Sequence, residues 1–281
     1  MHLRIATCRP MPEADGDEEI LLAALAARGI EARMAAWNDP REDWDAPLPT
    51  VIRSTWDYVL ALPRFLEWAE RAERSGPLWN PLAVVRGNVH KRYLVELAAR
   101  GVPTVPTALV ERGSSTRIAT LARERSWSRL ILKPAVGAAS RGTKRFEAHE
   151  HDAAQRHLDL LLAQGDALVQ PYLDSVEGHG ERALVCIEGE LTHAVRKSPR
   201  FADGEERVSA ELPIEKDERA LAEQVLALVP QGLLYARVDV ARAADGKPRL
   251  MELELVEPSL FLRESPRALA RLSDALARRL A

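Results

Sequence analysis

The stretch VDVARAADGKPRLMELELVEPSL, residues 238–260, contains two strand-like segments joined by the turn ADGK. Alternate residues of a β-strand point to the same face of a sheet. Arg237 and Asp239 therefore share one face of the first segment, and Glu252 and Glu254 share one face of the second. If the segments pair as a hairpin, three carboxylates and an arginine lie together. Such a face is either a solvated surface or a site that binds a cation.

The chain has the composition of an ordinary soluble globular protein. Its 281 residues are 46% apolar and 29% charged, and the net charge of −3 argues against nucleic-acid binding. Two cysteines, Cys8 and Cys186, cannot make a disulfide framework and favour a reducing cytoplasm. The N-terminus does not resemble a signal peptide, and no apolar run is long enough to span a bilayer. We therefore expect a cytoplasmic protein that binds neither nucleic acid nor membrane.

Residues 1–86 alternate strand-like and helical patterns. LRIATC and TVIRST predict buried strands, whereas DEEILLAALAARGI (17–30) and LPRFLEWAERAERSG (62–76) predict amphipathic helices. Strand–helix–strand order predicts a small parallel sheet, whose ligands usually bind beyond the carboxyl ends of the strands. RSTWDY (53–58) lies at such an end. It forms either part of a ligand site or a packed loop anchored by Trp56.

The rest of the chain predicts two further units, residues 87–166 and residues 167–281. The first contains NVHKRYLVELAARG, a helix with Asn88 as its N-cap, and then two strands joined by a loop of small residues in RLILKPAVGAASRGTKRFE (129–147). The second contains the hairpin ERALVCIEGELTHAVRK (181–197), the carboxylate hairpin and a closing basic helix. The chain therefore divides into three stretches.

The loop KPAVGAASRG, residues 133–142, follows a lysine and consists of small residues. It is not a P-loop, because Lys133 precedes the glycines and no Gly-Lys-Ser/Thr follows. Backbone N–H groups of such a loop can still approach phosphate oxygens closely. A plain hairpin loop would have a similar composition. Phosphates and carboxylates together require a divalent cation between them, and Mg²⁺ suits that mixture.

These motifs, in this order, resemble the ATP-grasp enzymes over nearly the whole chain. Lys133 and its loop resemble the phosphate flap of the family, LVQPYL (168–173) resembles the hinge that contacts adenine, and ARVD followed by MELE resembles the pair of metal-binding strands. Glu254 stands where the family usually has asparagine, and Lys91 resembles its second phosphate-binding lysine. The resemblance implies an α+β ATP-grasp fold with a small N-terminal α/β (pre-ATP-grasp) domain at residues 1–86.

Within that superfamily, RSTWDY, THAVRKSP and MELELVEPSLFL are most similar to the group that includes the cyclo-ligase of D-cycloserine formation, which closes O-ureido-D-serine into a ring. This resemblance implies ATP and one or two Mg²⁺ ions as cofactors. The implied metal ligands are Asp239, Glu252 and Glu254. The implied ATP-binding residues are Lys91, Lys133, Gly137, Ala138, Ala139, Ser140, Gln170, Pro171, Tyr172, Leu173, Asp174, Glu181, Arg207 and Met251.

Some of these implied roles have alternatives. Asp174 or Glu181 would bind the ribose hydroxyls, but either could be a solvated loop charge. Arg207 would contact phosphate or substrate, and is otherwise an exposed loop arginine. Met251 follows the family pattern as an adenine contact, although strand alternation points it away from Glu252.

The chemistry of such a ligase gives Arg237 a role. A carboxylate does not react with an amine at neutral pH, because its leaving group is oxide. Phosphorylation by ATP converts the carboxylate into an acyl phosphate, and phosphoryl transfer depends mainly on positioning and charge neutralisation. Arg237 is suited to bind the transferring phosphoryl group or the tetrahedral oxyanion. The alternative is a cross-strand salt bridge to Glu252 or Glu254.

RSTWDY and the exit of the carboxylate hairpin predict the substrate site. Arg53 can offer a planar fork to a carboxylate, and Trp56 would form a wall of the pocket. We expect the substrate to be a small amino-acid-like acid. The predicted substrate-binding residues are Arg53, Ser54, Thr55, Ser259 and Leu260.

Two functions fit this pattern: an ATP-dependent carboxylate–amine ligase or cyclo-ligase, and a non-catalytic ATP-binding regulatory module of the same fold. The presence of both lysines, Arg237 and all three carboxylates favours the enzyme, because binding alone would not require the full set. A dinucleotide-dependent oxidoreductase is set aside, since no Gly-X-Gly-X-X-Gly follows the first strand. The sequence is compatible with a homodimer.

Overall fold

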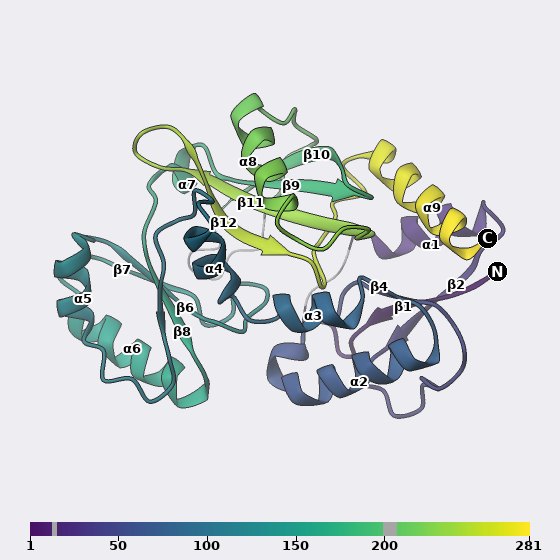
Figure 1. Cartoon of the computed structure of the whole chain (residues 1–281), viewed down its shortest axis with the longest axis horizontal. Helices are drawn as coiled ribbons and strands as arrows, with labels where there is room; N and C mark the ends of the chain where they lie inside the picture. Colours follow the sequence, from purple (N-terminus) through teal and green to yellow (C-terminus); the bar gives the residue numbers. More distant parts are fainter. Residues whose placement is uncertain (13–15, 199–206) are drawn as a thin grey trace.

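The computed structural model describes residues 1–12, 16–198 and 207–281 of the chain. Within these residues the strands form three four-stranded sheets, one parallel and two antiparallel, with helices packed around them (Figure 1). This arrangement confirms the predicted α+β class. No helix of the described ranges is both long and apolar enough to cross a bilayer.

The N-terminal sheet is parallel, as the strand–helix–strand order predicts, with its strands in the order β2-β1-β3-β4. Helix α2 covers it with an apolar stripe at helical spacing, Phe65, Trp68, Ala69 and Ala72, all buried. The elements of this part are β1 (His2–Thr7), α1 (Glu18–Ala26), β2 (Glu31–Ala36), β3 (Thr50–Ile52), the 3₁₀ helix η1 (Tyr58–Leu60), α2 (Leu62–Ser75) and β4 (Leu78–Trp79).

The second sheet, in the order β5-β8-β6-β7, holds the small-residue loop between β6 and β7. Its elements are β5 (Ala108–Val110), α5 (Ile118–Arg125), β6 (Leu130–Pro134), β7 (Lys144–Phe146), α6 (His151–Gln164) and β8 (Ala167–Pro171). The third sheet, in the order β10-β9-β11-β12, contains the carboxylate hairpin. Its elements are α7 (Ser175–Gly178), β9 (Glu181–Ile187), β10 (Glu190–Lys197), α8 (Lys216–Leu226), β11 (Tyr235–Arg242), β12 (Pro248–Glu254) and α9 (Pro266–Leu280).

The helix predicted over residues 88–101 is wrong in its N-terminal part. The chain instead forms two short helices, α3 (Leu82–Asn88) and α4 (Tyr93–Ala99), so Asn88 ends one helix and does not cap the next. The Asn88 side-chain amide pairs with the backbone of β12, donating to the Leu253 carbonyl at 2.9 Å and accepting from the Leu255 N–H at 2.8 Å. Asn88 therefore acts as a strand partner.

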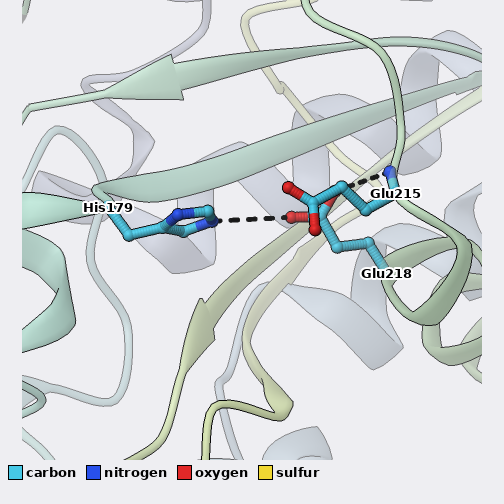
Figure 2. Close-up of side chains that lie close together, drawn as sticks. All are labelled: His179, Glu215 and Glu218. Atoms are coloured by element: carbon cyan, nitrogen blue, oxygen red, sulfur yellow. Dashed lines mark hydrogen bonds and ion pairs between the residues drawn. The ribbon is translucent and has the colours of Figure 1, made fainter.

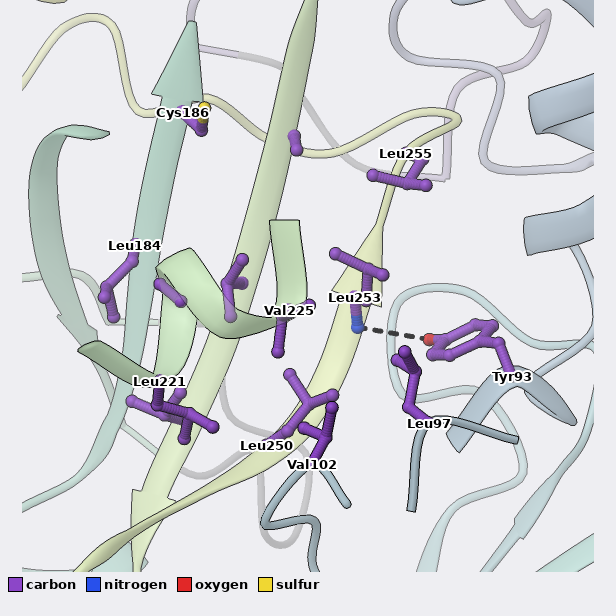
Figure 3. Packing of buried hydrophobic residues seen from close by; sticks show 14 of the residues in the cluster. Tyr93, Leu97, Val102, Leu184, Cys186, Leu221, Val225, Leu250, Leu253 and Leu255 are labelled. Atoms are coloured by element: carbon purple, nitrogen blue, oxygen red, sulfur yellow. Dashed lines mark hydrogen bonds between the residues drawn. The ribbon is translucent and has the colours of Figure 1, made fainter. Parts of the chain in front are cut away.

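Strand β12 lies at the edge of the third sheet, where unpaired backbone groups would otherwise face outward. Besides Asn88, the Tyr93 hydroxyl accepts from the Leu253 N–H at 3.2 Å (Figure 3). The loop after α4 adds two backbone bonds to Leu250 of 2.8 and 2.9 Å. Helix α4 and its flanking loops thus cover the edge of the strand that carries Glu252 and Glu254.

The predicted domain boundaries do not coincide with the element boundaries. The boundary at residue 86 lies inside α3. The boundary at residue 166 separates β8 from β5 and β6, its partners in the second sheet.

The N-terminal part and the third sheet share one hydrophobic core. Leu3 and Ile5 of β1 cluster with Tyr235 of β11 and with the buried face of α9, and α1 lies beside α9 (Figure 1). Asn80 fixes this junction. Its Nδ2 donates to the carbonyls of Tyr235 and Leu255, and its Oδ1 accepts from the Leu234 N–H, all at 2.8 Å.

Replacing Asn80 should therefore destabilise the fold. Asn80→Ala leaves three buried backbone groups without partners, and we expect the free energy of unfolding to fall by about 2–4 kcal/mol. Urea unfolding followed by circular dichroism measures this change. Gln231→Ala, at an exposed amide, is the control and should change stability little. Equal effects of the two substitutions would contradict the role of Asn80.

Candidate active site

Strands β11 and β12 pair in the register that the alternation predicts. Arg237 lies opposite Glu254, and Asp239 lies opposite Glu252. The four side chains therefore belong to one face of the hairpin. The predicted convergence is confirmed.

Met251 departs from the strand alternation. Asp239 pairs with Glu252, but the next residue of β11, Val240, pairs with Leu250, so Met251 is an extra residue in β12. This β-bulge re-aims the side chain, as bulges near functional sites often do. Met251 and Glu252 consequently line the same cavity. The expectation that they face opposite sides is wrong, because simple alternation ignores the bulge.

One cavity gathers most of the residues that the sequence predicts for ATP. It lies among β6, β8, β10, β11, β12 and the loop after β6. The predicted ATP-binding residues that line it are Lys91, Lys133, Gly137, Ala138, Ala139, Ser140, Gln170, Pro171, Tyr172, Leu173, Glu181 and Met251. The structure does not bring Asp174 and Arg207 into this lining.

Asp174 and Arg207 therefore fit the alternative interpretation, in which both are exposed loop charges. The Asp174 side chain is mostly exposed and forms an ion pair with Arg129. Arg207 is exposed, and its carbonyl accepts from the Ser198 N–H at 2.9 Å. Of the two acids predicted for the ribose hydroxyls, Glu181 lines the cavity and Asp174 does not.

An apolar cluster in this cavity suits a flat heterocycle. Tyr172 and Val176 are buried together, and Ile131, Leu173 and Met251 pack against them. The Gln170 side-chain amide donates a hydrogen bond to Thr107 Oγ1 at 2.8 Å. The hinge at 170–173 thus offers an apolar surface for adenine.

The two lysines reach the carboxylates and the small-residue loop. Lys133 Nζ donates to Glu252 Oε1 at 2.6 Å, and Lys91 Nζ lies 3.9 Å from Glu252 Oε2. Lys91 also donates to the Gly137 carbonyl at 2.6 Å. Burial opposes ionisation of Glu252, but the two lysines outweigh it and lower the Glu252 pKa to about 2. A Cβ at Gly137 would lie 2.9 Å from Pro134 Cγ, so the turn requires glycine there.

Asp239 is fully buried behind the cavity surface and is held by two cations. Arg237 donates to both of its oxygens at 2.8 Å, and Lys197 Nζ donates to Oδ2 at 2.7 Å. These cations lower the Asp239 pKa against the opposing effect of burial. Lys197 also bridges to Glu181 at 2.6 Å, and burial still raises the pKa of Glu181 to about 7.

Lys197 was not among the residues predicted from the sequence. Lys197 lies within THAVRKSP and is buried at the end of β10, a strand whose residues are mostly buried although several are polar. Strand pattern alone does not distinguish such a lysine from an edge residue. Its role depends on the partner strand β11, which lies next to β9 and not next to β10.

Arg237 forms the salt bridge that was one of its two alternatives, and its phosphoryl-binding role stays a prediction. Its Nη2 forms a cross-strand ion pair with Glu254 at 2.5 Å, which confirms the salt-bridge alternative. It also lines the cavity and donates to the Ser259 carbonyl at 3.2 Å. Burial raises the pKa of Glu254 although Arg237 opposes the rise.

The prediction that RSTWDY binds substrate directly is not supported for Arg53, Ser54 and Thr55. All three are buried outside the cavity lining. Arg53 Nη1 donates to the Pro258 carbonyl at 2.7 Å and pairs with Asp17 at 3.7 Å. The Ser54 hydroxyl lies 2.8 Å from Thr7 Oγ1 and 2.6 Å from a carboxylate oxygen of Glu18. Arg53 thus joins the N-terminal part to the exit of β12, whereas Ser54 bonds within the N-terminal part.

Leu260 is also misassigned, because it is fully buried in the core shared with α9. Ser259 and Trp56 do line the cavity. Of the five residues predicted to bind substrate, Ser259 alone lines the cavity. Tyr58 and Glu257 belong to it and were missed.

Within the described ranges, a second group of possible metal ligands lies outside this cavity. His179, Glu215 and Glu218 have ligand atoms within 4.8 Å of one another (Figure 2). However, Glu218 accepts two bonds of 3.1 Å from Arg182, and Arg242 binds Glu215 at 2.7 Å. Arginines already neutralise both carboxylates, so this group is a structural ion-pair network at the start of α8.

Comparison with known proteins identifies the family. Residues 3–80 match the family model described as D-cycloserine synthetase DcsG, N-terminal domain. Over 282 residues the chain is 36% identical to the cycloserine biosynthesis protein DcsG of Streptomyces lavendulae, covering 95% of this chain and 94% of that protein. The chain belongs to the DcsG family of ATP-grasp proteins. Its fold matches the crystal structure of D-cycloserine synthetase DcsG with a TM-score of 0.91 at 33% identity, over 100% of both chains.

The DcsG-family fold is shared with more distant ATP-grasp ligases. D-alanine–D-alanine ligase from Bacillus anthracis, complexed with ATP, has a TM-score of 0.67 at 16% identity and covers 100% of this chain and 98% of that one. The ligase PsnB, complexed with minimal precursor, Mg and ADP, has a TM-score of 0.65 at 19% identity, with coverage of 100% and 97%. Membership of the DcsG family makes this protein an enzyme of the ligase class. The more distant structures show that it shares the fold of ATP-grasp ligases.

The buried position of Arg53 in this DcsG-family protein gives a stability prediction. Arg53→Ala removes a buried charge and its bond to the Pro258 carbonyl, so we expect the free energy of unfolding to fall by about 2–4 kcal/mol. Chemical denaturation measures the change. Arg41→Ala, which breaks an exposed pair with Asp39, should have little effect. An unchanged free energy of unfolding for Arg53→Ala would contradict the role of Arg53 in holding the segment after β12.

Proposed function

We propose that this protein is a magnesium-dependent ligase that uses ATP to activate a small amino-acid-like carboxylate as an acyl phosphate, which a nitrogen nucleophile then attacks. The observation that carries the proposal is the composition of one cavity. It combines an apolar cluster for adenine, two buried lysines, glutamates on an inward strand face and an arginine. A simple nucleotide-binding pocket would not need all four features.

The residues divide between binding and chemistry. Lys91 and Lys133 are point charges that bind phosphate oxygens, and the loop at 137–140 places backbone N–H groups near them. Glu181 binds the ribose hydroxyls. Leu173 and Met251 contact adenine.

Asp239, Glu252 and Glu254 are the proposed Mg²⁺ ligands. All three offer oxygen atoms, the ligand type that Mg²⁺ prefers, and they occupy paired positions on β11 and β12. Their present partners are flexible lysines and one arginine, which can turn to phosphate oxygens instead. Bound by these carboxylates, Mg²⁺ would neutralise the negative charge of the ATP phosphates.

The reaction then has two steps. A substrate carboxylate oxygen attacks the γ-phosphorus, and ADP leaves with its bridging oxygen. The nitrogen next attacks the acyl carbon, loses its proton and expels phosphate. Arg237 stabilises the negative charge that develops on the phosphoryl group and on the acyl oxygen, because its guanidinium lines the cavity beside Glu254.

We further propose that the nitrogen belongs to the same molecule, so that the ligase closes a ring. Similarity over the full chain to DcsG, a cycloserine biosynthesis protein, supports this form of the reaction. O-ureido-D-serine is accordingly the first substrate to test. A panel of amino acids and other O-substituted serines tests intermolecular ligation in the same assay.

Glu252→Gln tests the metal-binding hairpin. The substitution removes one acceptor charge with almost no change in volume, and we expect ADP release to fall on the order of 10³-fold while the circular dichroism spectrum stays that of the wild type. Because Lys133 loses its counter-charge, we expect a lower free energy of unfolding as well. ADP release is measured with Mg-ATP and O-ureido-D-serine. Glu223→Gln, on the exposed face of α8, is the matched control.

Full Mg-ATP-dependent turnover by Glu252→Gln would make the carboxylate hairpin a structural feature. ATP binding by the wild type without ADP release on any compound of the panel would favour the non-catalytic module.

A further inference from the structure

Glu257 is a buried carboxylate in the wall of the cavity, in the bend that follows β12. Only 9% of the residue is exposed. Asp239, Glu252 and Glu254 each have a cationic partner, but no ion pair to Glu257 forms within the described part of the chain. Its side chain interacts with the Tyr58 hydroxyl. An ionised carboxylate is costly to bury without a counter-ion. Glu257 is therefore suited to a cation that a ligand brings into the cavity.

Side chains from other segments contact the backbone carbonyls of residues 256–258, around Glu257. The Val256 carbonyl lies 2.9 Å from the Tyr235 hydroxyl, the Glu257 carbonyl accepts from Trp56 Nε1 at 3.0 Å, and the Pro258 carbonyl accepts from Arg53 at 2.7 Å. The carbonyls of Glu257 and Pro258 are thus fixed, and that of Val256 competes with the Ile52 carbonyl for the one proton of the Tyr235 hydroxyl. The main chain that carries the Glu257 side chain is therefore held in place at the cavity wall.

Glu257 shares the cavity with charged residues that are proposed to bind phosphate and metal. Glu254, Lys91 and Arg237 are charged groups that act on its ionisation, and all three line the same cavity. Burial raises the pKa of Glu257 to about 8, and Glu254 adds to the rise. A cationic group that entered this part of the cavity would favour the ionised form of Glu257 and lower this pKa, next to the proposed site of phosphoryl transfer.

We propose that Glu257 binds the ammonium group of the substrate and thereby selects an amino acid over a simple carboxylic acid. This subsite rests on the proposed function, which places a small acid in the same cavity. An α-ammonium is a compact cation with three donors, and the Glu257 carboxylate supplies a buried acceptor for it. Trp56 and Arg53 act as positioning residues through the backbone of Glu257. RSTWDY therefore contributes to specificity indirectly.

Binding of paired compounds tests this subsite without requiring turnover. The probes are O-ureido-D-serine and D-serine, and their counterparts without the amino group, 3-(ureidooxy)propanoic acid and 3-hydroxypropanoic acid. Each is titrated calorimetrically into the full chain with Mg²⁺ and a non-hydrolysable ATP analogue. For the wild type we expect the amino-bearing member of a pair to bind roughly 10- to 100-fold more tightly.

Glu257→Gln should remove that preference. The Kd of the amino-bearing probe should rise roughly 10- to 100-fold, whereas the Kd of its deaminated counterpart and of the ATP analogue should stay nearly unchanged. Glu264→Gln is the matched control, because Glu264 follows in the same segment but does not line the cavity. It should retain the wild-type preference.

Equal binding of both members of each pair by the wild type would overturn the assignment. So would an unchanged preference in Glu257→Gln, or binding of no amino-bearing probe by the wild type. A wild-type protein that shows the preference, loses it in Glu257→Gln and yet releases no ADP would refute the proposed reaction while supporting the ammonium subsite.

Discussion

Burial of several carboxylates along one hairpin is the constraint on which the rest of this structure depends. Ionised carboxylates are costly in a protein interior unless cations and hydrogen bonds compensate them. Asp239 is compensated by Arg237 from its own strand and by Lys197 from β10, and Glu252 is compensated by Lys133 from β6. The second and third sheets must therefore face each other across the hairpin. The cavity between them is the direct result of this charge pairing.

The same constraint explains how the N-terminal part contributes. Its described residues supply no cation to the carboxylates of the hairpin in an ion pair. Instead, Asn80 holds the backbone of β11 and the end of β12, while Arg53 and Trp56 hold the bend that follows. These contacts fix Glu257, the cavity carboxylate that has no cation in an ion pair among the described residues. The substrate end of the cavity is thereby built from two distant segments of the chain.

The sequence predicted the interactions that follow from strand periodicity. Alternation placed Arg237 and Glu254 on one face, and the register pairs them directly. It could not predict the bulge at Met251, because a bulge depends on how two strands align. Local composition likewise suggested Asn88 as a helix cap, but its partner Leu253 is 165 positions away. The polar residues of RSTWDY were taken for ligand contacts, although burial of Arg53 makes it a backbone clamp.

The most direct test of the central claim is the position of the metal in a complex. Crystals of the full chain grown with Mn²⁺ and a non-hydrolysable ATP analogue would locate the metal by its anomalous scattering. The account predicts a peak bound by Glu252 and at least one of Asp239 and Glu254, with Lys133 turned from Glu252 to a phosphate oxygen. Nucleotide in the cavity without metal at these carboxylates, or metal solely at the group around His179, would contradict it.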